Sequence, residues 1–156
     1  MPQLANVTYE EITVGQTASY SAWSKSATSH CLPLSVATST PSTSTPILPP
    51  VPCSGRIATA CLTGAFISAA LAMELPGPGT IYLGQSLRFR LPVKIGDTLT
   101  VTLEVTDKQD RRNIVTLDCR AHNQAGKLVA TGTAEVMAPA QKMSIERPQP
   151  PRVRID

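Results

Sequence analysis

The sequence has few charged residues, few aromatic residues and no long hydrophobic run. Only 16% of its 156 residues are charged and 4% are aromatic, and the formal net charge is +3. Nucleic-acid-binding domains carry a larger basic excess, so we expect no nucleic-acid partner. No apolar stretch approaches the roughly 20 residues that cross a bilayer, and the first residues lack the blocks of a signal peptide. We therefore expect a soluble cytoplasmic protein with no membrane partner.

Cysteine is also scarce and shows no metal-binding spacing. None of the four cysteines forms a CxxC pair, and without a secretory signal their even number is poor evidence for disulfides: Cys31, Cys53, Cys61 and Cys119. We expect no zinc site. The apolar content of 42% suffices for one domain with a real core, and the length argues against two domains.

The second half of the chain alternates apolar and polar residues as half-buried strands do. The expected strands cover residues 81–89, 98–105, 114–121 and 128–136. Polar turns at residues 108–111 and 123–126 separate the last three strands. Antiparallel hairpins are the economical interpretation.

A nearly uncharged segment rich in alanine and leucine, residues 57–75, precedes these strands and ends at Pro76-Gly77-Pro78-Gly79. Its composition predicts a buried helix. Because this helix is apolar on nearly all sides, it needs cover all round, and an antiparallel sheet curling around it would supply that cover. We therefore predict an α+β hotdog fold, with an antiparallel sheet wrapped around a long central helix.

Residues 28–54 fit neither pattern. They are rich in serine and threonine and include six prolines. Proline removes a backbone donor and fixes φ, so we expect neither a helix nor a central strand. By composition this atypical segment is an extended, poorly ordered loop.

Residues 75–89, followed by Pro92-Val93 and Gly96-Asp97, resemble the signature after the central helix of MaoC-like, (R)-specific enoyl-CoA hydratases. The resemblance extends from about Tyr9 through Gly15 and Ser19, and then from Gly55 to about Pro139. It implies a single MaoC-like domain over residues 1–140 and a C-terminal tail over residues 141–156. The implied reaction is hydration of trans-2-enoyl-CoA to (R)-3-hydroxyacyl-CoA, in fatty acid metabolism. The implied partners are an acyl-CoA thioester and a second copy in a homodimer, and coenzyme A belongs to the substrate, so no cofactor is expected.

The catalytic motif of that family is missing here. In the family an Asp and a His, five residues apart, move the protons, and Thr38 and Thr43 occupy their places. A threonine hydroxyl does not titrate near neutrality and is a poor general base. We expect hydration to be impaired in a chain with this sequence.

The altered residues are those that a one-base frame slip would encode. Codons for Asp-Val-Asn-Pro-Val-His-Leu-Asp-Pro, read one base later, give residues 38–45, and Pro46 follows. A second, shorter slip converts the family's His-Gly-Met at the helix start into Thr59-Ala60-Cys61. We hypothesise two local frame slips, either in the gene or in the determination of its DNA sequence.

The resemblance also suggests residues that would bind the substrate. The oxyanion donor would be the backbone N–H of Ala60, beside Cys61, and a backbone donor survives a change from glycine to alanine. Tyr82 and Leu83 would line the acyl tunnel, with plain core packing as the equal alternative for both.

Other polar residues have simpler explanations. Turn chemistry accounts for Asp97, and a solvated strand face accounts for Asp118. His122, on a strand near a turn, is explained as a solvated or satisfied histidine. Five basic residues could meet coenzyme A phosphates or simply lie at the surface: Arg88, Arg90, Lys94, Arg111 and Arg112.

Two other classes of protein compete with the hydratase. The first is a non-catalytic hotdog domain that binds acyl-CoA or acyl carrier protein, and the second is a scaffold without a ligand. A thioesterase, another hotdog activity, is disfavoured because the signature after the helix points to the hydratase branch.

Overall fold

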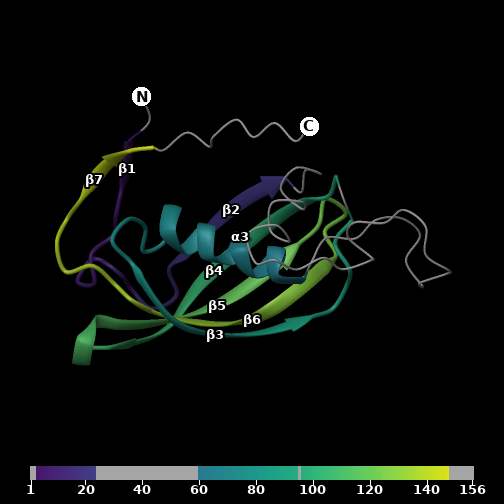
Figure 1. Ribbon diagram of the computed structural model, residues 1–156. Coiled ribbons are helices and arrows are strands. Elements are labelled where there is room, and N and C mark those ends of the chain that lie inside the picture. Colours follow the sequence, from purple (N-terminus) through teal and green to yellow (C-terminus); the bar gives the residue numbers. More distant parts are fainter. Residues whose placement is uncertain (1–2, 24–59, 95, 148–156) are drawn as a thin grey trace, which may run out of the picture.

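A five-stranded antiparallel sheet curves around α3 (Ala60–Met73) in the computed structural model of the chain (Figure 1). The structure describes residues 3–23, 60–94 and 96–147. The strands lie in the order β2-β4-β5-β6-β3. Their bounds are Thr17–Trp23 for β2, Ile81–Phe89 for β3, Thr98–Gln109 for β4, Ile114–His122 for β5 and Leu128–Met137 for β6. The predicted hotdog arrangement is confirmed.

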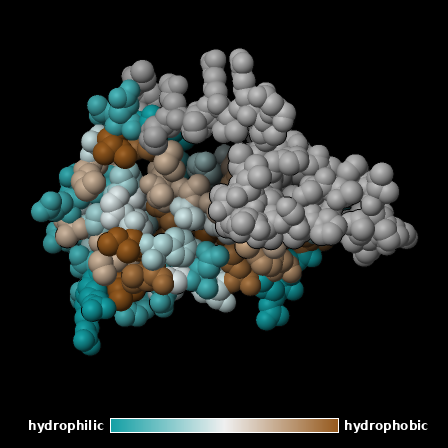
Figure 2. Space-filling model, viewed as in Figure 1, coloured by the Kyte–Doolittle hydropathy of each residue, from teal (hydrophilic) through white to brown (hydrophobic). Residues whose placement is uncertain are grey.

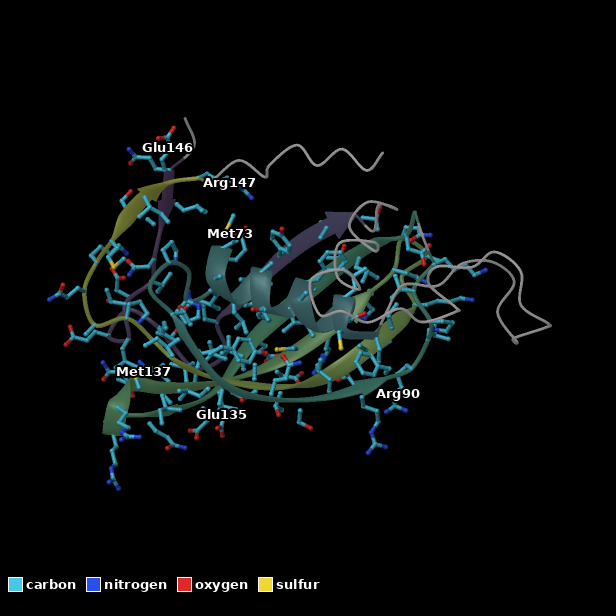
Figure 3. The ribbon with its side chains drawn as sticks, viewed as in Figure 1. Met73, Arg90, Glu135, Met137, Glu146 and Arg147 are labelled. Carbon is cyan, nitrogen blue, oxygen red and sulfur yellow. The ribbon has the colours of Figure 1, made fainter. Side chains whose placement is uncertain are left out.

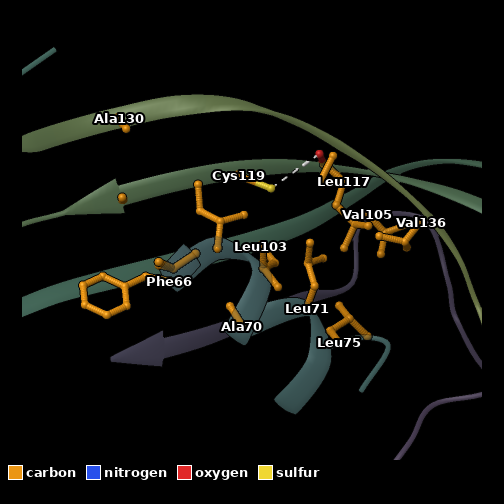
Figure 4. Packing of buried hydrophobic residues seen from close by; sticks show 14 of the residues in the cluster. Phe66, Ala70, Leu71, Leu75, Leu103, Val105, Leu117, Cys119, Ala130 and Val136 are labelled. Atoms are coloured by element: carbon orange, nitrogen blue, oxygen red, sulfur yellow. Dashed lines mark hydrogen bonds between the residues drawn. The ribbon is translucent and has the colours of Figure 1, made fainter. Parts of the chain in front are cut away.

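The core forms because the predicted alternation turns one face of the sheet toward the helix. Leu99, Val101, Leu103 and Val105 of β4 are 0–1% exposed. They pack with apolar residues of β5 and with Phe66, Ala70 and Leu71 of α3 (Figure 4). Burial of this apolar area, at about 25 cal/mol per Å², is the main favourable contribution to folding.

The structure corrects the prediction that the helix is covered on all sides. Cys61, Ala65, Ser68 and Ala72 are exposed, and their spacing of three or four residues places them on one face of α3. Their side chains are small, so leaving them outside the core of a single chain loses little apolar burial. The helix is also shorter at its end than predicted, since Glu74 and Leu75 lie beyond it, while residues 57–59 are outside the described part.

The predicted turn at residues 108–111 is corrected as well. β4 continues through Lys108 and Gln109, which pair with Val115 and Ile114 of β5. A short 3-10 turn, η1 (Arg111–Asn113), then closes the hairpin. The Lys108 ammonium donates to the backbone oxygens of Tyr9 (2.8 Å) and Ile12 (2.5 Å), so a residue that looks like turn sequence anchors the N-terminal segment.

The two ends of the described chain are joined by a small second sheet. β1 (Gln3–Ala5) pairs with β7 (Ser144–Glu146), which lies in the segment that we expected to be a tail. The buried Asn6 side chain links the segments beside these two strands. Its Nδ2 donates to the backbone oxygen of Gln141 (2.9 Å), and its Oδ1 accepts from the backbone N–H of Met143 (2.8 Å). No described helix is long and apolar enough to span a bilayer.

Replacing Asn6 should therefore weaken the fold. Asn6→Ala removes both side-chain hydrogen bonds and leaves a Met143 donor without its acceptor, so we expect a loss of about 1–3 kcal/mol in the free energy of unfolding. Urea denaturation would measure it. The control is Gln3→Ala, at an exposed residue of β1, which should change stability by less than about 0.5 kcal/mol. Equal effects of the two variants would contradict the role of Asn6.

Candidate functional site

The first turn of α3 is an accessible helix N-terminus. Ala60 and Cys61 are exposed, and no acidic residue lies in this turn. The first N–H groups of a helix have no intrahelical acceptor, and the helix dipole makes this end electropositive. Such an end suits an oxygen that gains negative charge, as the oxyanion prediction for Ala60 requires. The donor role itself stays a prediction.

The structure separates the two residues predicted to line an acyl tunnel. Tyr82 is half-buried, pairs with buried Val136 and packs against the core. Leu83 follows at an irregularity in the β3–β6 pairing and is 46% exposed. Only Tyr82 is thus brought to the core of this chain, and Leu83 lies on its surface.

Tyr82 forms a pair with a residue that the sequence reasoning missed. Its hydroxyl donates a short hydrogen bond to Oε1 of Gln85. Burial, and then the neighbouring Cys119, raise the pKa of Tyr82 to about 12, so the hydroxyl stays protonated at neutral pH. Gln85 pairs with buried Ala134, which places it on the inner face of the sheet.

Gly64 lets the helix approach this pair closely. A Cβ added at Gly64 would lie 3.2 Å from Gln85 Nε2 and 3.5 Å from Leu87 Cδ1. Glycine inside a helix costs about 1 kcal/mol relative to alanine, and a close approach is one reason to accept that cost. Gly64, in a segment rich in alanine, was therefore the feature of the sequence that could have indicated this contact between α3 and β3.

The predicted acid/base positions cannot be placed beside these residues. Thr38 and Thr43, with the whole atypical segment 28–54, lie outside the described residues. Within the described ranges, no group of three or more His, Cys, Asp or Glu side chains could hold a metal ion.

Two of the polar residues that we set aside, Asp97 and Asp118, contact neighbouring residues in the structure. Asp97 Oδ2 accepts from the Lys94 N–H (2.8 Å) and its Oδ1 accepts from Gln124 Nε2 (2.9 Å), which is turn chemistry. Asp118 forms an ion pair with Arg120 (2.7 Å), and its side chain is 22% exposed. In Figure 3, Arg90 lies just beyond the end of β3 and apart from Met73, the last residue of α3.

Known proteins resemble this chain in sequence. The family model of the MaoC like domain matches residues 51–125. An (R)-specific enoyl-CoA hydratase of Rhodospirillum rubrum is 49% identical over 86 residues, and one of Aeromonas caviae is 46% identical over 78 residues. These matches cover 55% and 50% of this chain and 59% and 58% of the relatives, so the chain matches rather more than half the length of each.

Solved structures resemble the chain over most of its length. An R-hydratase of Pseudomonas aeruginosa in the unliganded form has a TM-score of 0.92 and 42% identity, covering 99% of this chain and 100% of that one. The (R)-hydratase of A. caviae involved in PHA biosynthesis has a TM-score of 0.78 and 34% identity, covering 83% and 99%. The fold is the hotdog fold that these neighbours share. The chain belongs to the MaoC-like family of (R)-specific enoyl-CoA hydratases.

The two described cysteines should differ sharply in reactivity. Cys119 is buried, and burial, with the Asp118 charge adding to it, raises the pKa of its thiol to about 12, whereas Cys61 is exposed at the helix start. In native protein at pH 8, we expect Cys61→Ser to remove one rapidly alkylated thiol and Cys119→Ala to remove none. Intact-mass spectrometry after brief iodoacetamide treatment would count the labels. Rapid labelling lost in Cys119→Ala would contradict the burial of that thiol.

Proposed function

We propose that this protein binds trans-2-enoyl-CoA and is built for the addition of water that gives (R)-3-hydroxyacyl-CoA. The observation that carries the proposal is the 42% identity, over 99% of the chain, to an R-hydratase of the same fold. The accessible first turn of α3 supports it, because it offers a backbone donor at Ala60 for the thioester oxygen. A cytoplasmic role in fatty acid metabolism goes with this substrate.

The reaction separates into a part that the described residues can perform and a part that they cannot. Hydration requires a water activated for attack at C3, a proton delivered to C2, and donors on the thioester oxygen. The backbone at Ala60 would supply the oxygen donor. We assign the proton transfers to the positions of Thr38 and Thr43, where a hydroxyl cannot replace a carboxylate or an imidazole. The reaction changes no oxidation state overall, so we propose no cofactor beyond the coenzyme A of the substrate.

A second candidate is a non-catalytic domain that binds acyl-CoA or acyl carrier protein. It is favoured by one observation, the threonines at both acid/base positions. The two candidates predict the same ligand-binding surface but different turnover.

Crotonyl-CoA hydration would distinguish them. A chain with this sequence should hydrate crotonyl-CoA more slowly by about 10²–10⁴-fold for each missing group than a chain in which residues 38–46 and 59–61 are rewritten to the family motifs. The loss of enoyl-thioester absorbance measures the rate. A rate in the unaltered chain, with its mass verified, that equals the rewritten chain's rate would contradict the assignment of Thr38 and Thr43.

The encoding DNA should be resequenced, and the intact mass of the protein measured, before the rates are compared. Uninterrupted codons for residues 28–61, together with an intact mass that matches the sequence, would remove the sequencing-error version of the frame-slip hypothesis. The rewritten chain then tests whether the motifs restore turnover.

We also propose that two copies pair through β3. β3 ends the order of the sheet, and an edge strand presents unpaired backbone groups. Ile81, Leu83 and Phe89 of this strand are 56%, 46% and 47% exposed. Hydrophobic residues also lie among hydrophilic ones on the face that Figure 2 shows. Pairing of two β3 strands would join the two sheets and cover these side chains.

A charge on β3 should therefore disrupt the dimer. We expect Leu83→Lys to shift the protein from dimer to monomer at micromolar concentration, because the lysine ammonium would have to be desolvated at the interface. Light scattering after size-exclusion chromatography measures the mass in solution. Val14→Lys, at a residue 62% exposed and away from β3, is the matched control. A dimer that persists in Leu83→Lys, or an unaltered protein that is monomeric, would count against pairing through β3.

A further inference from the structure

The inner face of β3 carries an amide donor whose orientation is fixed. Because the Tyr82 hydroxyl donates to Gln85 Oε1, the other end of that amide, Nε2, is the end that faces α3 at Gly64. A hydroxyl proton can only be given to the oxygen of an amide, so the pair defines which way Gln85 is turned. Among the described residues, Gln85 Nε2 has no hydrogen-bond acceptor.

This donor lies one helical turn from the candidate oxyanion site. Gly64 follows Ala60 by four residues, which places both on the same side of α3. Gln85 is exposed, so a ligand can reach its amide. Gly64 has no side chain that could cover Nε2, and even a single carbon added there would lie 3.2 Å from it.

We propose that Gln85 donates a hydrogen bond from Nε2 to a carbonyl oxygen of the acyl-pantetheine ligand, and that Tyr82 is the positioning residue that holds this amide. The inference rests on the proposed acyl-CoA ligand. It assigns Tyr82 a polar role in place of tunnel lining, and it gives Gln85 a role that the helix–sheet packing alone does not require.

Binding measurements test the inference without turnover. The unaltered full chain is titrated calorimetrically with butyryl-CoA, which is saturated and cannot be hydrated, and with coenzyme A alone. Gln85→Leu should weaken the affinity for butyryl-CoA by about 2- to 12-fold, the effect of one neutral hydrogen bond. Gln85→Glu keeps the side-chain size and lacks the donor, so it should weaken binding at least as much. Ser86→Ala, at the neighbouring residue of β3, is the control and should bind like the unaltered chain.

A double-mutant cycle separates positioning by Tyr82 from simple packing. Tyr82→Phe removes only the hydroxyl and should weaken butyryl-CoA binding by less than Gln85→Leu does. In Tyr82→Phe/Gln85→Leu the loss should equal that of Gln85→Leu alone, because the hydroxyl acts through the amide. Additive losses would overturn the positioning role.

The two ligands identify the carbonyl oxygen. If Gln85→Leu weakens butyryl-CoA and coenzyme A equally, the acceptor is a pantetheine amide; if it weakens butyryl-CoA alone, the acceptor is the thioester. Unchanged affinity for both ligands in Gln85→Leu and Gln85→Glu would overturn the inference and leave the proposed function standing. Failure of the unaltered chain to bind either ligand would overturn the proposed function, and this inference with it.

Discussion

Packing of one side of α3 against the inner face of the sheet is the constraint on which the other features depend. Leu62, Ile67 and Leu71 are 0–2% exposed against the core. Their burial fixes the rotation of the helix, and the rotation decides which residues of the first turn stay accessible. The exposure of Ala60 and the uncovered face along the helix both follow from it.

Small residues determine how closely the elements around this core approach one another. A Cβ at Gly132 of β6 would lie 1.9 Å from the Ser86 oxygen of β3, so a glycine is required there for the strands to pair as they do. Gly64 allows the corresponding approach of α3 to Gln85 and Leu87. Together the two glycines set how closely β3 approaches β6 and the helix.

Recognition and turnover make different demands on this molecule. A thioester oxygen needs directed neutral donors, and a helix N-terminus and a side-chain amide can both supply them without a titratable group. Proton transfer needs groups that titrate near neutrality, which the hydroxyls of Thr38 and Thr43 are not. The proposed function therefore separates the binding of the ligand from its turnover in a chain with this sequence.

The sequence alone determined the features that local patterns encode. Period-two alternation located the strands, with β3 at its predicted bounds of residues 81–89, because the side chains of a strand point alternately to its two faces. Apolar composition located the helix, and residues 75–89 indicated the family. Only the tertiary structure decided the uncovered face of α3, the extension of β4 through Lys108, the Asn6 junction and the Tyr82–Gln85 pair. These features depend on contacts between residues far apart in the sequence, which no local pattern can predict. Lys108 binds the backbone oxygen of Tyr9, 99 residues away, and the close approach of α3 to β3 at Gly64 depends on how the whole core packs.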